Sequence, residues 1–260
     1  MTLGLFDPAF LGGLAAGGGG YDADAQAYIT AVEAADGQSL ETAVKDAINA
    51  FFVGCKSDGI FNAIKASCIL AGARTLSGAL VPLVSTMPAP TNVGGNFVAG
   101  DYNRKTGLKG DGSTKYLDSN RADNADPQNS IHLSIHKSSI STGAANYYIG
   151  SGLATHIRTG YHRNRNNAVD TVYIDTTGFC GMSRSNSSNY TFRSGAATST
   201  ITATSNAPAT QTHHIFKRAD SVGQFIDARV AFYSIGESLD LTLLDARVST
   251  LMSDLAAAIP

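Results

Sequence analysis

The segment from Gln224 to Leu255 constrains the fold most, because a strand-like run leads directly into an amphipathic helix. Residues 225–235 are rich in β-branched and aromatic side chains and are long enough for a central strand. Alternate residues of a strand point to opposite faces, and we expect the more consistently apolar face to form the core. That face comprises Ile226, Ala228, Val230, Phe232 and Ser234.

A helix is expected immediately after this strand. Gly236 interrupts the strand pattern, and Ser238, Asp240 and Thr242 each offer a side-chain oxygen that could cap a helix. Apolar residues then recur at steps of three and four, which is typical of one buried helix face. They are Leu244, Val248, Leu251, Met252 and Leu255. The C-terminal segment is therefore predicted to be a scaffold in which this helix packs back onto an apolar surface.

The composition indicates a globular chain with a weakly charged surface. Charged residues make up 15% of the 260 residues and the net charge is −2, which argues against a nucleic-acid partner. Such a surface favours packing against other subunits. Three cysteines without paired spacing do not indicate a disulfide framework, so we expect assembly in a reducing cytoplasm. No N-terminal apolar stretch is long enough to predict a membrane span.

The chain divides into four predicted parts. Residues 1–20 form a Gly-rich arm, for which both simple disorder and docking onto another subunit stay open. Residues 21–85 are predicted to form three short helices ending near Gly37, Gly54 and Gly72, with Cys68 a small buried side chain of the third. Residues 86–98 form a linker, and residues 99–260 form a β domain with the C-terminal helix.

The β domain is predicted from many short strands separated by turns. Period-two patterns and turn clusters every eight to fourteen residues favour an antiparallel sandwich or jelly roll. The expected strands cover residues 114–117, 131–137, 145–149, 156–161, 169–175, 179–183, 190–193, 199–203, 213–217 and 223–235.

Three parts of the chain carry a resemblance to known proteins. Residues 101–108 with 111–117, which run DYNRKTGL and DGSTKYL, look like the opening strands of concanavalin A-like lectin/glucanase (laminin-G-like) jelly rolls. The run Val230–Gly236 with its helix resembles the closing part of such modules in tailed-bacteriophage structural proteins, and residues 24–68 resemble the helical segment that precedes them. The resemblance implies a mainly β protein: an antiparallel concanavalin A-like β-sandwich, preceded by a small helical region and closed by a C-terminal helix.

The sequence offers no strong catalytic pattern. The glucanases of this fold carry two glutamates on one strand, whereas this chain has no glutamate between Glu41 and Glu237. Asp170 and Asp175 are five residues apart and would lie on opposite faces of a regular strand. An aspartate-only inverting pair stays open, but we expect no enzymatic activity and assign no catalytic residue.

No metal site and no cofactor are expected either. His132 and His136 would share the outward face of a strand, but four residues span roughly 13 Å, too far for one zinc ion. They are interpreted as surface histidines. The acidic segment 118–126 contains the one candidate calcium loop, and a solvated turn is the preferred interpretation.

One basic and aromatic concentration is a candidate carbohydrate-binding site. Tyrosine rings can stack on sugar faces, while arginine and asparagine side chains can hydrogen-bond hydroxyl groups. The candidate residues are Tyr147, Tyr148, His156, Arg158, Tyr161, Arg163 and Arg165. The alternatives are an ordinary hairpin with a solvated tip or a subunit contact.

The first functional hypothesis is therefore a bacteriophage virion structural protein, either a tail appendage or a capsid decoration. It would be located in the virion after assembly in the host cytoplasm and would contact other virion proteins. We expect a homo-oligomer, with a trimer as one form, and no contact with nucleic acid or membrane. The second hypothesis is a lectin-like module that binds a host surface glycan, and the third is a polysaccharide hydrolase.

Overall fold

The structure is a computed structural model that describes residues 20–143, 146–167 and 170–260. The expected Gly-rich arm, apart from Gly20, lies outside these residues. Every strand pairing in the described part of the chain is antiparallel. The strands form two sheets, A and B, whose buried faces enclose a common apolar core. The predicted mainly β antiparallel sandwich is confirmed.

Sheet A contains eight strands in the described chain. Its path runs through β13 (Ala197–Thr202), β12 (Asn189–Ser194), β11 (Gly178–Arg184), β6 (Ile131–Ser139), β15 (Arg229–Gly236), β4 (Gly107–Lys109) and β3 (Tyr102–Asn103), with β1 (Ile64–Ile69) also pairing with β15.

Sheet B contains seven strands over the same residues. They follow the order β10 (Thr171–Val172), β9 (Tyr161–Asn164), β8 (Thr155–Arg158), β7 (Tyr147–Gly152), β14 (Thr212–Ile215), β5 (Leu117–Ala122) and β2 (Thr91–Asn92). The expected linker, residues 86–98, thus contributes a strand to this sheet.

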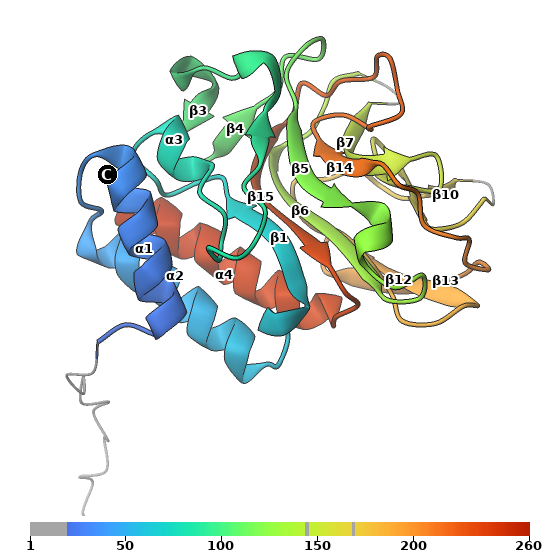
Figure 1. Cartoon of the computed structure of the whole chain (residues 1–260), viewed down its shortest axis with the longest axis horizontal. Helices are drawn as coiled ribbons and strands as arrows, with labels where there is room; N and C mark the ends of the chain where they lie inside the picture. The colour runs from blue at the N-terminus through green and yellow to red at the C-terminus, as the bar shows by residue number, and fades with distance from the viewer. Residues whose placement is uncertain (1–19, 144–145, 168–169) are drawn as a thin grey trace, which may run out of the picture.

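A helical layer covers the other face of sheet A. It is formed by α1 (Ala23–Asp36), α2 (Thr42–Ser57), α3 (Leu76–Ala79) and α4 (Leu241–Ala258), which gather on one side of the molecule (Figure 1). Buried side chains of α1, α2 and α4 pack with Phe179 and Phe232 of sheet A in a second apolar cluster. The molecule therefore has three layers: helices, sheet A and sheet B. No helix in the described residues is long and apolar enough to cross a membrane.

The start of α4 follows the sequence expectation. Of the three candidate caps, Asp240 is the one used: its carboxylate accepts hydrogen bonds from the backbone N–H groups of Thr242 (2.7 Å) and Leu243 (3.3 Å). The predicted apolar stripe of this helix is buried. Its burial against α2 and sheet A seals the helical cluster.

Strand β15 differs from its predicted alternation because it contains a bulge. Val230 pairs with Lys137 while Phe232 pairs with the preceding residue, His136, so Ala231 has no opposite residue. Val230 therefore lies in the sandwich core and Phe232 in the helical cluster. Tyr233 and Ile235 complete the sandwich face in place of Phe232 and Ser234, which corrects the predicted core face.

The third predicted helix is wrong. Residues 61–63 form one 3₁₀ turn, and Ile64–Ile69 form β1, which pairs with β15. Ile64 and Ile69 contact the helical cluster, while Ala66 and Cys68 face the sandwich. A strand buried on both faces shows no period-two pattern, so its apolar spacing resembled that of a helix. Cys68 is buried as predicted.

The interpretation of His132 as a surface histidine is also wrong, and His136 is half-buried. Helix α4 packs against β11 and β12 of sheet A, beside β6. His132 is fully buried, with Nδ1 2.6 Å from the carbonyl oxygen of Glu237 and Nε2 2.6 Å from the hydroxyl of Ser234. Burial lowers its pKa to about 4. His132 is therefore a neutral core residue at physiological pH.

Candidate functional site

The predicted strand 156–161 is a hairpin, and the hairpin builds the candidate site. Strands β8 and β9 are joined at Thr159-Gly160, where Gly160 has a φ of +72°. Arg158 pairs with Tyr161, and Ile157 pairs with His162. Because the buried Ile157 faces the sandwich, residues of the opposite parity point outward from sheet B.

Five of the seven predicted site residues meet on this outer side of sheet B. We call the group the arginine–tyrosine face, and it consists of Tyr147, His156, Arg158, Tyr161 and Arg163, together with Asp170. Tyr147 joins from the neighbouring strand because it pairs with Arg158 across β7 and β8. The hairpin alternation therefore brings together side chains that the sequence only placed near one another.

Asp170 holds the two arginines of this face in position. Its carboxylate accepts a hydrogen bond from Arg158 and lies 2.5 Å from Nε of Arg163 and 3.3 Å from Nε2 of His156. Burial alone would raise the pKa of Asp170, but the hydrogen bond from Arg158 and the nearby positive charges lower it below the ordinary value. The carboxylate is therefore ionised at neutral pH, and it fixes the guanidinium groups beside Tyr161.

Tyr161 is the exposed aromatic ring of the arginine–tyrosine face. Its residue is 37% exposed, and the guanidinium carbon of Arg158 lies 4.3 Å from its ring centre. The side chains of Arg158 and Arg163 keep 16% and 20% of their surface exposed. A ring and two guanidinium groups are thus available to a ligand from solvent.

Tyr147 and His156 form the floor of the face. Both are buried, and their rings meet edge to face with centres 4.9 Å apart. The guanidinium of Arg218 covers the ring of Tyr147 at 4.4 Å and donates to its hydroxyl. Burial lowers the pKa of His156 to about 4, so this imidazole is neutral at pH 7. These side chains support the exposed residues and have little surface for a ligand.

Tyr148 and Arg165 are not part of this face, which corrects their assignment as ligand-binding residues. Tyr148 points into the sandwich core and is fully buried. Arg165 is also fully buried, where its Nε lies 3.2 Å from a carboxylate oxygen of Asp123 and its Nη atoms donate to backbone carbonyls. Neither side chain can reach a ligand in solvent.

Sequence reasoning missed Asp170 and Arg218 as partners of this face. Asp170 was considered only as a catalytic carboxylate, although its position after the basic hairpin was visible. Arg218 lies 60 residues later in the chain than Arg158. No sequence pattern indicated that it would cover Tyr147.

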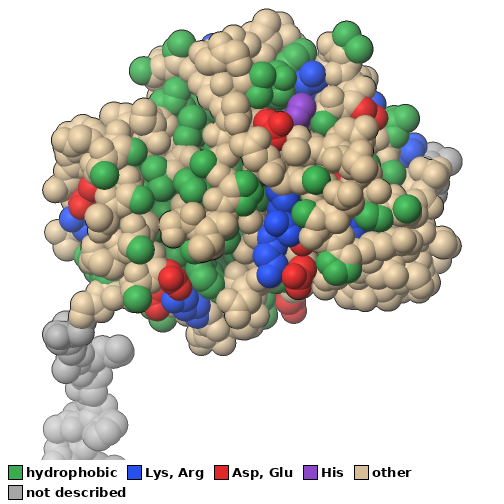
Figure 2. All heavy atoms as spheres, viewed as in Figure 1, with side chains coloured by type: hydrophobic (Ala, Val, Ile, Leu, Met, Phe, Trp, Pro, Cys, Tyr) green, Lys and Arg blue, Asp and Glu red, His purple; other side chains and the backbone are tan. Residues whose placement is uncertain are grey.

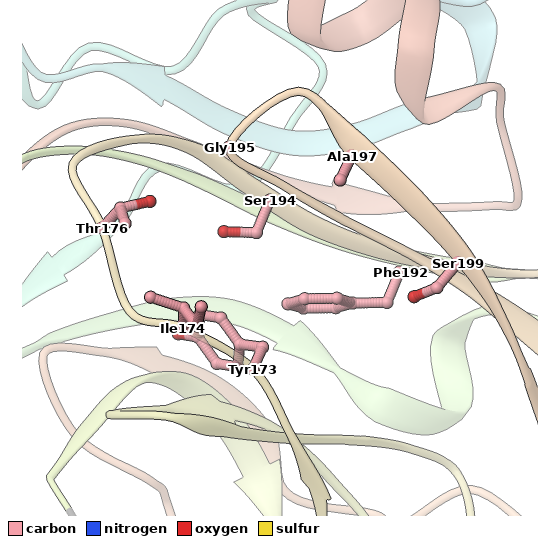
Figure 3. Close-up of a pocket in the computed structure, with 8 residues that line it drawn as sticks. All are labelled: Tyr173, Ile174, Thr176, Phe192, Ser194, Gly195, Ala197 and Ser199. Carbon is pink, nitrogen blue, oxygen red and sulfur yellow. The ribbon is translucent and has the colours of Figure 1, made fainter.

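A pocket lies at the nearby edge of the sandwich (Figure 3). It has a volume of about 380 Å³ and lies between the segment that follows β10 and the β12–β13 hairpin. Tyr173 and Phe192 contribute aromatic rings, with Ile174 on the rim. Its lining residues are Tyr173, Ile174, Thr176, Phe192, Ser194, Gly195, Ala197 and Ser199. The size and the mixture of rings and hydroxyl groups are typical of a small-ligand site.

The candidate calcium segment has internal partners for its carboxylates. Asp126 accepts from Arg121, and Asp123 contacts Arg165. Within residues 20–143, 146–167 and 170–260, no three His, Cys, Asp or Glu side chains are grouped so that they could hold a metal ion. The segment is a set of ion pairs.

In comparisons with known proteins, the matches to this chain are all solved structures. No family model and no curated protein matches the chain. The binding domain of botulinum neurotoxin serotype D matches with a TM-score of 0.44 and 12% identity over 76% of this chain and 52% of that chain. Trypanosoma rangeli sialidase, in complex with a difluorosialic acid, matches with a TM-score of 0.44 and 9% identity over 82% and 39%. Domain 4 of an extracellular arabinanase from Geobacillus stearothermophilus, in complex with arabinotriose, matches with a TM-score of 0.37 and 10% identity over 76% and 98%.

These matches correct one expectation about the activity of the chain. The expectation that the chain is not an enzyme is contradicted, because a sialidase and a domain of an arabinanase are among the matched structures. None of these three structures is named as a bacteriophage protein. The chain spans about half or less of the first two structures. At identities of 9 to 12%, the matches transfer no substrate, reaction or partner to this chain.

Proposed function

We propose that this chain is a carbohydrate-binding module and that the arginine–tyrosine face is its binding surface. The observation that carries the proposal is the exposed ring of Tyr161 beside the two guanidinium groups that Asp170 holds in place. An aromatic ring supplies an apolar platform for a sugar, and arginine N–H groups donate to sugar oxygens. Because the arginines are already oriented, little conformational entropy is lost when a ligand binds.

The charge of the face indicates the class of sugar. Arg158 and Arg163 carry two positive charges against the single negative charge of Asp170, while His156 is neutral at pH 7. The remaining positive charge favours a saccharide that bears a carboxylate or another acidic group. We therefore expect acidic glycans to bind more tightly than neutral ones, and binding to weaken as salt is added.

A glycan array that includes acidic and neutral bacterial polysaccharides tests this function. We expect binding of at least one acidic glycan by the wild-type protein and loss of that binding in Tyr161→Ala and Arg158→Ala. Val222→Ser is the matched control, because Val222 is fully exposed and lies outside both the face and the pocket. Binding that is lost in Ile174→Ala and unaffected in Tyr161→Ala would contradict the proposal and assign the function to the pocket.

The same preparations allow a direct assay of hydrolysis. Each glycan that binds is incubated with the wild-type protein, and released reducing ends are measured. Binding without turnover supports a recognition module. Turnover that is lost in Asp170→Asn would instead show that the carboxylate at this face is catalytic.

We also propose a virion structural role for the chain, as a tail appendage or a capsid decoration assembled in the host cytoplasm. The favouring observation is the weakly charged surface, on which positive and negative side chains lie next to one another on the face in Figure 2. Such a surface suits contacts with other virion proteins and with further copies of the chain. Peptides from this chain should be found by mass spectrometry in purified virions, and their absence would contradict this role.

A further inference from the structure

Lys137 occupies an unusual position for a lysine. On β6 the inward stripe of Leu133 and Ile135 continues directly to Lys137, whose side chain has no exposed surface. Lysine is almost never fully buried unless it is paired, because its charge loses hydration. The interior of the sandwich therefore contains a primary amine that has no contact with solvent.

The partner of this amine is the carboxylate of Asp175. Asp175 lies in the segment between β10 and β11, and Lys137 faces the start of β11 because it pairs with Gly178. Nζ of Lys137 donates directly to Oδ1 of Asp175, whose side chain is 9% exposed. Since Oδ1 is bonded to Cγ, the amine already lies next to a carbonyl carbon.

Two tyrosines enclose the pair and bind the carboxylate. The ring centres of Tyr148 and Tyr173 lie 4.8 and 5.3 Å from Nζ of Lys137. The hydroxyl of Tyr148 donates to Oδ2 of Asp175 at 2.7 Å, and that of Tyr173 lies 3.2 Å from Oδ1. Burial raises the pKa of both tyrosines, so both hydroxyls keep their protons at neutral pH. Each carboxylate oxygen therefore lies against a tyrosine hydroxyl that can polarise the carboxyl group.

We propose that Lys137 and Asp175 form an intramolecular isopeptide bond. A proton first passes from the ammonium group to the carboxylate, which leaves a neutral amine and a carboxylic acid. The amine lone pair attacks Cγ to form the C–N bond, and the C–Oδ2 bond then breaks. Oδ2 leaves with that electron pair, takes up the second proton from nitrogen and receives the first proton from Oδ1, so the products are a secondary amide, with Oδ1 as its carbonyl oxygen, and one water molecule.

The surroundings favour this condensation. Two buried charges disappear, which removes the desolvation cost of the ion pair. The hydroxyl of Tyr148 contacts the oxygen that leaves and can pass a proton to it. The reaction needs no oxidant, cofactor or second protein. The product would join β6 covalently to the segment that leads into β11.

The test is mass spectrometry. The full-length chain is purified in its folded state and then denatured, its mass is measured, and its tryptic peptides are mapped. We expect a mass lower than that of the sequence by one water, no cleavage after Lys137, and one fragment that joins the Lys137 and Asp175 peptides. The map is essential because Asp-Gly sequences, such as Asp58-Gly59, can also lose water. Separate unmodified peptides for Lys137 and Asp175 from the folded wild-type protein would overturn the proposal.

Two variants test the two reacting groups separately. Asp175→Asn can form the same amide but releases ammonia, so its linked form should be lighter than its own sequence by the mass of ammonia. Lys137→Arg retains the cation and has no reactive amine, so it should have its full sequence mass. A joined fragment in Lys137→Arg would overturn the assignment of the reacting amine.

Discussion

At the residue scale, several charged side chains of this weakly charged chain serve the interior. Arg184 is fully buried and donates to the backbone carbonyls of Asn164, Asn186, Asn189 and Ala203. Arg165 is buried against Asp123 and joins the segment after β9 to the segment after β5. Arg165, which the sequence assigned to a binding surface, is therefore a structural residue.

Removing one partner of the buried Arg165–Asp123 pair should destabilise the fold strongly. We expect Arg165→Met to lower the free energy of unfolding by about 3 to 5 kcal/mol, because the buried Asp123 loses its guanidinium partner and keeps only His213, 3.4 Å away, and the N–H of Ala209. Arg163→Met is the control: its side chain is 20% exposed and Asp170 keeps Arg158, so the cost should be about 1 kcal/mol or less. Urea unfolding measures both, and equal losses would contradict the assignment.

Buried histidines predict a pH dependence of stability. Burial lowers the pKa of His132 from 6.5 to about 4, so the unfolded chain binds its proton more readily than the folded chain between these values. Stability should therefore be highest above pH 6.5 and should fall as the pH drops to about 4. The contribution of His132 is on the order of 3 kcal/mol.

The matching measurement is urea unfolding at a series of pH values from 7.5 to about 4. In His132→Gln, whose side chain does not titrate, the loss of stability between pH 6.5 and 4 should be smaller than in the wild-type protein. Parallel curves for the two proteins would show that His132 does not contribute to the pH dependence.

Part of the site was predictable from residues alone. The sequence placed His156, Arg158, Tyr161 and Arg163 near one another, but it predicted one strand over residues 156–161. In such a strand Tyr161 would face away from Arg158, whereas the observed turn at Thr159-Gly160 pairs these two residues on one side of the sheet. The burial of Arg165 depends on Asp123, which lies 42 residues earlier, and no local pattern contains that information. Long-range partners decided which predicted residues became ligand-accessible and which became structural.

At the element scale, β15 and β1 show where periodicity stops being informative. The C-terminal strand and helix were predicted in the right order, and the apolar stripe of α4 is buried as expected. The bulge at Ala231 could not be predicted, because it arises from the pairing of β15 with β6. Strand β1 was taken for a helix because it is buried on both faces.

The β3–β4 hairpin depends on one glycine. Gly107 has a φ of +89°, and a Cβ atom at this position would lie 2.2 Å from the carbonyl oxygen of Val230. Gly107→Ala should therefore cost more than about 1 kcal/mol of stability, because it strains the turn and pushes β4 away from β15. Gly223→Ala is the control, since a Cβ there meets nothing within 4 Å. Similar unfolding midpoints for the two variants would contradict the dependence of the β3–β4 hairpin on Gly107.

At the scale of the whole molecule, the open edge of sheet A matters for assembly. Among the residues that the structure describes, strand β13 pairs only with β12, and five of its six residues are exposed, with no charge and no proline among them. The edge strands β3, β2 and β10 have two residues each. An unprotected edge of this length can pair with the same strand of a second copy.

The expected oligomer can be tested at this edge. Native mass spectrometry should give an oligomer for the wild-type protein and a monomer for Thr200→Lys, because a charge on the edge opposes strand pairing. The control Val222→Lys places the same charge on a fully exposed residue elsewhere and should leave the oligomer intact. A monomeric wild-type protein would contradict assembly through β13.

Isothermal titration with the best acidic glycan from the array tests most directly whether the arginine–tyrosine face of sheet B binds carbohydrate. We expect saturable binding by the wild-type protein and by Val222→Ser. We also expect a loss of at least tenfold in affinity for Tyr161→Ala, whose folded state is checked by its unfolding midpoint. Equal affinities for wild-type and Tyr161→Ala proteins would contradict carbohydrate binding by this face.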